Sequence, residues 1–135
     1  MNKLSAQLKD LVAATSRLQE SVFQPKNEFL RDSTIQRFEF TFELAWKVMK
    51  SVNAMLGVEC NSPRQCIRVS AQTGLINHPE RWISYANQRN YASHIYSESM
   101  AESIYESAKA CVGDVEALIE KVKEELAKRA REETS

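Results

Sequence analysis

The amino-acid sequence predicts an all-α protein, an antiparallel four-helix bundle with up-down-up-down topology and a broken third helix. Three observations lead to this class. Glycine and proline number only three each, too few for the turns of a multi-stranded sheet. Three runs of apolar residues recur at intervals of three and four, as on one face of a helix. Prolines that follow polar capping residues mark two further helix starts in the middle of the chain.

The first predicted helix ends at Gln24-Pro25, because proline cannot continue the helical hydrogen-bond ladder. Before that point, apolar residues follow one another at steps of three, four or seven. Together they form one face of an amphipathic helix. They are Leu4, Leu8, Leu11, Leu18 and Val22.

The second predicted helix carries the most regular apolar seam in the sequence. We expect Asp32 or Ser33 to cap its start and Gly57 to follow its end in a left-handed conformation. The seam fits antiparallel packing inside one bundle, or a dimer interface, and the spacing leaves both open. Glu43 and Lys47 form an i,i+4 pair that we assign to the solvated face. The seam residues are Ile35, Phe38, Phe42, Ala45, Met49, Val52 and Leu56.

The middle of the chain predicts two short helices. Ser62-Pro63 begins one that should run to Gly74, and Asn77-His78-Pro79 begins one that should end near Arg89-Asn90. A long last helix follows, opened by the capping pattern Ser99-x-x-Glu102. Its apolar face comprises Met100, Ile104, Ala108, Cys111, Val115, Leu118, Val122 and Leu126. We expect one domain over residues 1–128 and a frayed charged tail over residues 129–135.

Charge is distributed unevenly along the chain. Eighteen basic residues balance eighteen acidic ones, which argues against a whole-protein electrostatic grip on nucleic acid. Between residues 60 and 97, however, the one acidic residue is Glu80, and the basic ones include Arg64, Arg68, Arg81 and Arg89. With Tyr91 and other aromatic residues nearby, these arginines suit contacts with RNA phosphates and bases. They suit ion pairs with the acidic flanking helices equally well.

The three cysteines, Cys60, Cys66 and Cys111, are an odd set without C-x-x-C spacing. We interpret them as reduced, partly buried thiols of a cytoplasmic protein. The histidines show no metal-ligand spacing with them, so we expect no metal and no cofactor. No signal peptide and no run of 18 apolar residues are present, which predicts no membrane association.

The stretch from Arg89 to Tyr96 concentrates side chains with chemical uses. Arg89 offers a fork of donors that matches a phosphate, and His94 titrates near neutral pH and can transfer a proton. Asn90 could orient either group, and Tyr96 adds a hydroxyl. The alternative is a polar join that only ties two helices together.

The spacing Arg89-x4-His94, with the polar Asn90 directly after the arginine, resembles the R-x4-6-H motif of the HEPN superfamily. These all-helical domains occur in many RNases and toxins. With Tyr96, the stretch reads R-x4-H-x-Y, the form found in HEPN toxins that are paired with a minimal nucleotidyltransferase antitoxin. Residues 35–47 are similar to the second helix of nucleotidyltransferase substrate-binding proteins. In that family's order follow Ser62-Pro63-Arg64, Gly74-Leu75-Ile76 and Trp82.

The resemblance implies a homodimer in which two motifs face each other across one RNA-cleaving cleft. His94 would help to activate the ribose 2′-hydroxyl or protonate the leaving oxygen. Arg89 would stabilise the charge of the transition state, and Asn90 would orient the pair. Arg64, Arg68, Arg81 and Tyr91 are our candidates for RNA or nucleotide contacts. Cleavage of this kind needs no metal and leaves a 2′,3′-cyclic phosphate.

The resemblance also implies a regulatory partner. In the toxin–antitoxin version, a cognate minimal nucleotidyltransferase transfers AMP to the motif tyrosine, here Tyr96. The added phosphate would keep RNA out of the cleft. Two functions remain open: an RNase toxin held in check by this partner, and a non-catalytic subunit that binds a nucleotide or another acceptor for it.

Overall fold

The computed structural model describes residues 2–24, 27–92 and 97–134, and these residues form five α-helices and no strand. The helices are α1 (Asn2–Val22), α2 (Glu28–Met55), α3 (Pro63–Gln72), α4 (Pro79–Ala92) and α5 (Glu98–Thr134). The all-α class is therefore confirmed, and the third helical stretch is broken into α3 and α4, as predicted. The up-down-up-down four-helix bundle and the dimer stay predictions.

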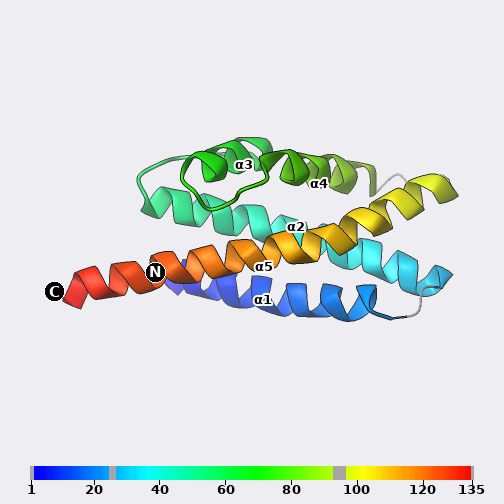
Figure 1. Ribbon diagram of the computed structural model, residues 1–135, viewed down its shortest axis with the longest axis horizontal. Helices are drawn as coiled ribbons and strands as arrows, with labels where there is room; N and C mark the ends of the chain where they lie inside the picture. The colour runs from blue at the N-terminus through cyan, green and yellow to red at the C-terminus, as the bar shows by residue number, and fades with distance from the viewer. Residues whose placement is uncertain (1, 25–26, 93–96, 135) are drawn as a thin grey trace.

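Helix α2 occupies the centre of the fold. It packs against each of the other four helices, whereas α1 packs against α2 and α5 alone among the described helices (Figure 1). Helices α3 and α4 lie on the opposite side of α2 from α1 (Figure 1). A side chain of α2 can therefore meet partners on any other helix, which is how the candidate site described below is assembled.

The apolar seam of α2 is used inside the chain. From Ile35 to Val52 its members are buried in one continuous core, and Leu56 packs against the edge of that core. The seams predicted for the first and last helices meet it there, together with Trp82 and Ile67. Of the two uses that the spacing left open, packing within one bundle is the one observed. A dimer would have to use a different surface.

Two helices begin earlier than predicted. Helix α2 is capped by Asn27, whose side-chain oxygen accepts a hydrogen bond from the Leu30 N–H at 2.8 Å. Asp32 is therefore inside the helix and does not cap it. Helix α5 begins after Ser97, whose hydroxyl accepts from the Met100 N–H at 3.2 Å, so Ser99 is already helical. In each case an N-cap residue nearer the preceding break satisfies the free N–H groups first.

The remaining helix boundaries follow the predicted signals closely. Gly57 and Gly74 both adopt positive φ angles, 88° and 82°, just after α2 and α3. Ser62 caps α3 and accepts from the Gln65 N–H at 3.2 Å, with Pro63 in the first turn. Helix α4 continues to Ala92, so residues 89–92 belong to its last turn and not to a join between helices.

A disulfide joins Cys60 to Cys66, with their Cα atoms 5.1 Å apart. Our interpretation of these two residues as reduced, partly buried thiols was wrong, since both are fully buried and bonded to each other. The physical reason is local: the capped turn at the start of α3 folds the chain back and brings the two residues within bonding reach. Cys111 is a free, buried thiol, and burial raises its pKa far above the usual range.

An ion-pair cluster fastens the start of α5 to the start of α2. The guanidinium of Arg31, which is largely buried, lies 2.5 Å from a Glu98 oxygen and 3.6 Å from a Glu102 oxygen. At the other end, Arg129 donates to the Met55 carbonyl at 2.5 Å. Helix α5 continues through Thr134, and fraying of the tail stays a prediction. None of the described helices is long and apolar enough to cross a membrane.

Candidate functional site

Arg89 lies in the last turn of α4 and reaches across to α2. Its Nη1 donates to the Oε2 of Glu43, and its guanidinium carbon lies 5.5 Å from the centre of the Phe42 ring. A cation over an aromatic ring is favourable, and so is a positive side chain at a helix C-terminus. The arginine side chain keeps 28% of its surface exposed. It is thus anchored by α2 and still open to a ligand.

Polar groups surround this arginine. The Nη2 of Arg89 donates to the Asn90 Oδ1 at 3.3 Å, so Asn90 lies beside it as the motif suggests. Glu39, one helical turn before Glu43, also faces it: burial raises the pKa of the Glu39 carboxyl, and the positive charge of Arg89 opposes that rise. Two carboxylates of α2 therefore lie near one guanidinium.

Arg81, two turns earlier on α4, has a different environment. Its Nε and Nη2 donate to both oxygens of Asp114 at 3.0 and 2.5 Å. The Tyr85 hydroxyl donates to the same carboxylate at 2.5 Å, and burial raises the pKa of Tyr85 well above its usual range. This arrangement matches the alternative reading of the basic residues, in which arginines pair with acidic groups of a flanking helix.

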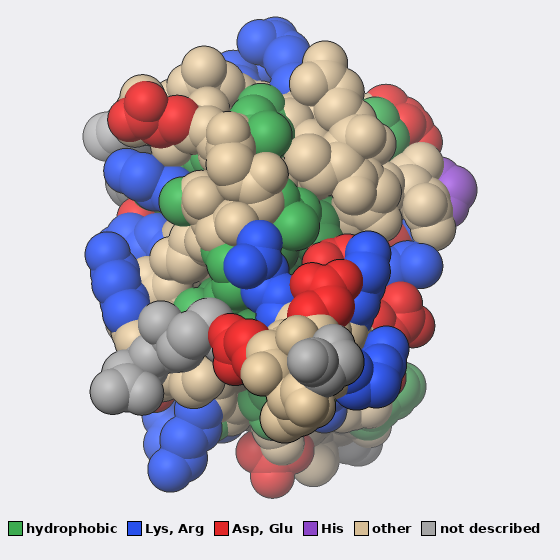
Figure 2. Space-filling view, turned by 90° about the vertical axis from the view of Figure 1, so that its left-hand side faces the viewer, with side chains coloured by type: hydrophobic (Ala, Val, Ile, Leu, Met, Phe, Trp, Pro, Cys, Tyr) green, Lys and Arg blue, Asp and Glu red, His purple; other side chains and the backbone are tan. Residues whose placement is uncertain are grey.

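The other predicted site residues are dispersed. Arg64 donates to the Asn87 side chain, and Arg68 is exposed and, within the described chain, makes no ion pair. Tyr91 is exposed at the end of α4. His94 and Tyr96 fall outside the described residues. At the end of the molecule where both termini lie, basic and acidic side chains are interspersed (Figure 2).

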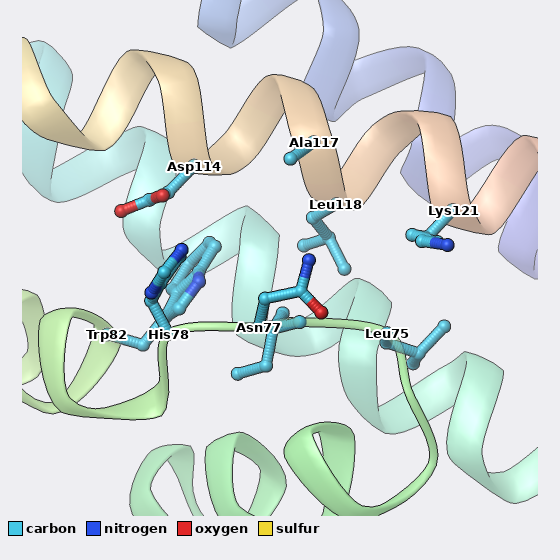
Figure 3. A pocket seen from close by; sticks show the side chains of 9 residues that line it. Leu75, Asn77, His78, Trp82, Asp114, Ala117, Leu118 and Lys121 are labelled. Carbon is cyan, nitrogen blue, oxygen red and sulfur yellow. The ribbon is translucent and has the colours of Figure 1, made fainter.

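A small cavity lies between the start of α4 and α5, as Figure 3 shows. Its volume is about 60 Å³, against the roughly 300–1,000 Å³ of pockets that bury small-molecule ligands. It is therefore too small for a nucleotide. The side chains that line it include Leu75, Asn77, His78, Trp82, Asp114, Ala117, Leu118 and Lys121 (Figure 3).

A wider hollow, of about 390 Å³, lies between α1 and α2. Its lining includes Arg17, Arg37 and the 62%-exposed Phe40, and none of the described residues that line it is acidic. None of the predicted site residues lines this hollow. The sequence signal for it is Phe40, an apolar residue on the polar side of the α2 pattern. Arg17 is remote from Phe40 in sequence, and only the packing of α1 on α2 brings Arg17 to the same hollow.

Sequence reasoning also missed the two acidic partners. The predicted Glu43–Lys47 pair exists, with 3.5 Å between Nζ and Oε1, but Glu43 is not simply solvated because its second oxygen binds Arg89. Asp114 was not among the predicted site residues, and the signal that could have found it is its position as an acid within an apolar run. Across the described residues no group of three or more histidine, cysteine or acidic side chains is placed to hold a metal ion.

The chain matches the family described as "nucleotidyltransferase substrate binding protein like" over residues 6–124. It belongs to this family. The resemblance found in the sequence is thereby confirmed, because the match spans nearly all of the helical fold.

Relatives and solved structures agree with this assignment. A Haemophilus influenzae protein named "Probable ribonuclease HepT" is 29% identical over 93 residues, 65% of this chain and 62% of that protein's length. The crystal structure of a Thermus thermophilus protein superimposes with a TM-score of 0.79 at 27% identity, covering 83% of this chain and 98% of the other.

A second similar structure is the Shewanella oneidensis HEPN toxin, tri-AMPylated and in complex with MNT antitoxin. It has a TM-score of 0.73 at 20% identity and covers 89% of this chain and 96% of that one. At this identity the likeness shows a shared fold. The fold of this family member is thus also that of a HEPN toxin.

Proposed function

We propose that this protein is a HEPN-type toxin, a metal-independent endoribonuclease of the cytoplasm that acts through Arg89, Asn90 and His94. The observation that carries the proposal is Arg89 itself. It is anchored on α2, partly exposed, and flanked by the Asn90 amide in a chain with the fold of HEPN toxins. The relative named as a ribonuclease supports the same reaction class.

In the proposed reaction, the ribose 2′-oxygen attacks the adjacent phosphorus and the bond from phosphorus to the 5′-oxygen breaks. His94 accepts the 2′-hydroxyl proton or donates one to the leaving oxygen. Arg89 stabilises the negative charge that gathers on the phosphate oxygens in the transition state. The products are a 2′,3′-cyclic phosphate and a free 5′-hydroxyl, and every attacking and leaving atom comes from the RNA.

The proposal includes a homodimer whose two motifs share one cleft. Since the α2 seam is buried within the chain, we assign the dimer contact to the outer face of α2, where Phe29 and Phe40 are 88% and 62% exposed. These residues are eleven positions apart, three turns along one face of the helix. Phe40 is also one turn from Glu43. A second copy covering this face would bring its own Arg89 close.

The proposed regulator is a cognate minimal nucleotidyltransferase that transfers AMP from ATP to the hydroxyl of Tyr96. The tyrosine oxygen would attack the α-phosphorus, and pyrophosphate would leave. The resulting phosphodiester adds bulk and a negative charge within seven residues of Arg89. Both effects oppose the entry of an RNA phosphate. The similar toxin solved in its tri-AMPylated state supports this partner.

The nuclease proposal is tested with purified protein and single-stranded RNA in EDTA. We expect cleavage by the wild type, a cyclic phosphate at the product end, and loss of cleavage in His94→Ala with the helical content unchanged. Intact RNA in every condition where the wild-type protein is folded would refute the proposal.

The regulatory proposal is tested by incubating the protein with the partner and ATP, followed by intact-mass measurement. We expect the mass to rise by multiples of the AMP mass in the wild type and not in Tyr96→Phe. An unshifted wild type, or a shift that persists in Tyr96→Phe, would contradict it.

A non-catalytic subunit that binds a nucleotide or acceptor for the partner is the second candidate. The family's own description as substrate binding favours it. The cavity between the start of α4 and α5 is too small for a nucleotide, but the hollow of about 390 Å³ between α1 and α2 lies within the size range of ligand pockets. Binding of labelled nucleotide by a wild type that leaves RNA intact would select this function over the nuclease.

A further inference from the structure

The Glu43 carboxylate contacts two positively charged side chains, one from α4 and one from its own helix. Its Oε2 accepts a hydrogen bond from Arg89 on α4, and its Oε1 faces Lys47 of its own helix at 3.5 Å. About one third of its side chain, 35%, is exposed, so water screens the pair only in part. A charge-assisted hydrogen bond in such a setting orients its partners more firmly than an exposed pair does.

Two further contacts restrict the guanidinium of Arg89. The Phe42 ring lies under it, and the Asn90 Oδ1 accepts from Nη2. A guanidinium carries five N–H donors, and Glu43 and Asn90 each take one. Within the described contacts, the other three remain for a ligand. Glu43 of α2 therefore holds the Nη1 edge of the guanidinium, and the Phe42 ring beneath the guanidinium sets the orientation of its plane.

We propose that Glu43 is a positioning residue for Arg89, which rests on the proposed function of this site. By holding Nη1, the carboxylate fixes which edge of the guanidinium faces the RNA phosphate. A long arginine side chain without this anchor samples many rotamers, and misplacement by about 1 Å is enough to cost on the order of a hundredfold in rate.

The charge of Glu43 has an opposite effect on ground-state binding. A carboxylate beside the site repels an RNA phosphate, so its removal should not weaken RNA binding. Loss of alignment, in contrast, lowers the rate of the chemical step. The assignment therefore predicts a separated effect on the two constants: kcat falls and KM does not rise. A variant that merely lost folded protein would show a lower kcat in proportion to its unfolded fraction.

Glu39 provides a comparison on the same face of α2. It lies one turn before Glu43 and experiences the positive charge of Arg89 without an Arg89 hydrogen bond among the described contacts. If charge alone were the contribution of Glu43, neutralising Glu39 would produce a similar effect. If the hydrogen bond matters, only Glu43 substitutions lower kcat.

The experiment measures initial rates of RNA cleavage over a range of RNA concentrations for the full-length chain and four variants. We expect Glu43→Ala to lower kcat by about 10- to 100-fold with KM unchanged or reduced. Glu43→Gln keeps an oxygen that can accept from Arg89, so it should recover part of this loss, with a reduced KM. Glu39→Gln should keep the wild-type kcat.

Glu120→Ala is the matched control. Its carboxylate pairs with Lys123 at 3.9 Å on α5, 17 residues beyond the Ser103 that contacts Gln88, or roughly 25 Å along the helix. It should behave as wild type. Thermal unfolding reports the folded fraction of each variant, and if Glu43→Ala does not fold, Glu43→Gln decides.

Three results would overturn the Glu43 assignment while the nuclease proposal stands. A wild-type kcat in the folded Glu43 variants would remove the positioning role while the nuclease stands. A kcat that rises would mean that Glu43 blocks Arg89. An equal loss in Glu39→Gln would assign the effect to charge. A wild-type protein that leaves RNA intact would refute the nuclease itself, and the Glu43 assignment with it.

Discussion

Helix α4 carries two arginines that both reach an acidic group on another helix, and the two pairs differ in how completely they are satisfied. Arg81 meets both oxygens of Asp114, whose side chain is only 10% exposed and also accepts from Tyr85. Arg89 donates one N–H to Glu43, whose side chain is 35% exposed. Among the described contacts each guanidinium donates two hydrogen bonds, but the nearly buried carboxylate of Asp114 accepts three hydrogen bonds and the partly exposed carboxylate of Glu43 accepts one.

The difference follows from where the partners lie. Asp114 is on the inner face of α5 within an apolar run, so its charge must be neutralised by several donors at once. Glu43 is at the border between the core and the outer face of α2, where Lys47 and water also balance its charge. We therefore expect Arg81 to contribute mainly to stability and Arg89 mainly to the proposed function.

The largest expected difference between the two pairs is in RNA cleavage. Lysine keeps the charge of arginine but not its fork of donors. We expect Arg89→Lys to lower the rate of RNA cleavage by about 100-fold and to leave the free energy of unfolding nearly unchanged. Arg81→Lys should cleave RNA at the wild-type rate. Single-turnover rates for the two variants test this, and comparable losses in both would abolish the distinction.

The next effect concerns stability. Asp114→Asn removes a charge that Arg81 and Tyr85 both need, so we expect it to destabilise the fold by about 2–3 kcal/mol. Glu43→Gln should cost no more than about 0.5 kcal/mol, since its pair is partly screened. Urea denaturation followed by circular dichroism measures both. Equal losses would show that the two pairs are energetically alike.

The smallest effect is a pH dependence at Glu39. Burial raises the pKa of this carboxyl in the folded protein. The contribution of Glu39 to the free energy of unfolding is therefore fully present below the pKa that it has in the unfolded chain. This contribution is lost as the pH rises through the higher pKa of the folded protein. We expect Glu39→Gln to raise Tm by about 1–2 °C at pH 7 and to leave Tm unchanged near pH 3. Thermal unfolding at the two pH values measures it, and a gain of equal size at both would contradict the assignment.

Periodicity predicted the fold because each long helix buries one regular stripe, as the seam from Ile35 to Val52 shows. Local signals were less decisive where several capping residues compete, so Asn27 and Ser97 displaced the predicted caps. The motif located Arg89 and Asn90. Sequence spacing could not reveal that Glu43, 46 residues earlier, would anchor the arginine, because that contact exists only once α4 packs on α2.

The Cys60–Cys66 bond was missed for a related reason. Their spacing lacks a recognised motif, and only the turn into α3 brings the two residues together. Tertiary contacts of this kind depend on the direction in which a chain leaves a helix. A pattern of residue types along the sequence does not contain that direction.

Two ion pairs attach the end of α4 and the start of α5 to the same helix, α2. Arg31 forms an ion pair with Glu98, and Glu43 forms one with Arg89. Both ends of the connection from α4 to α5 are therefore fixed to α2. The two anchor residues are twelve positions apart, about 18 Å along the axis of α2. A residue inserted or deleted between Ala92 and Glu98 leaves this span unchanged, so the connection itself must absorb the altered length. The geometry of α2 thus fixes the separation of the two anchor points that the chain between Arg89 and Glu98 has to connect.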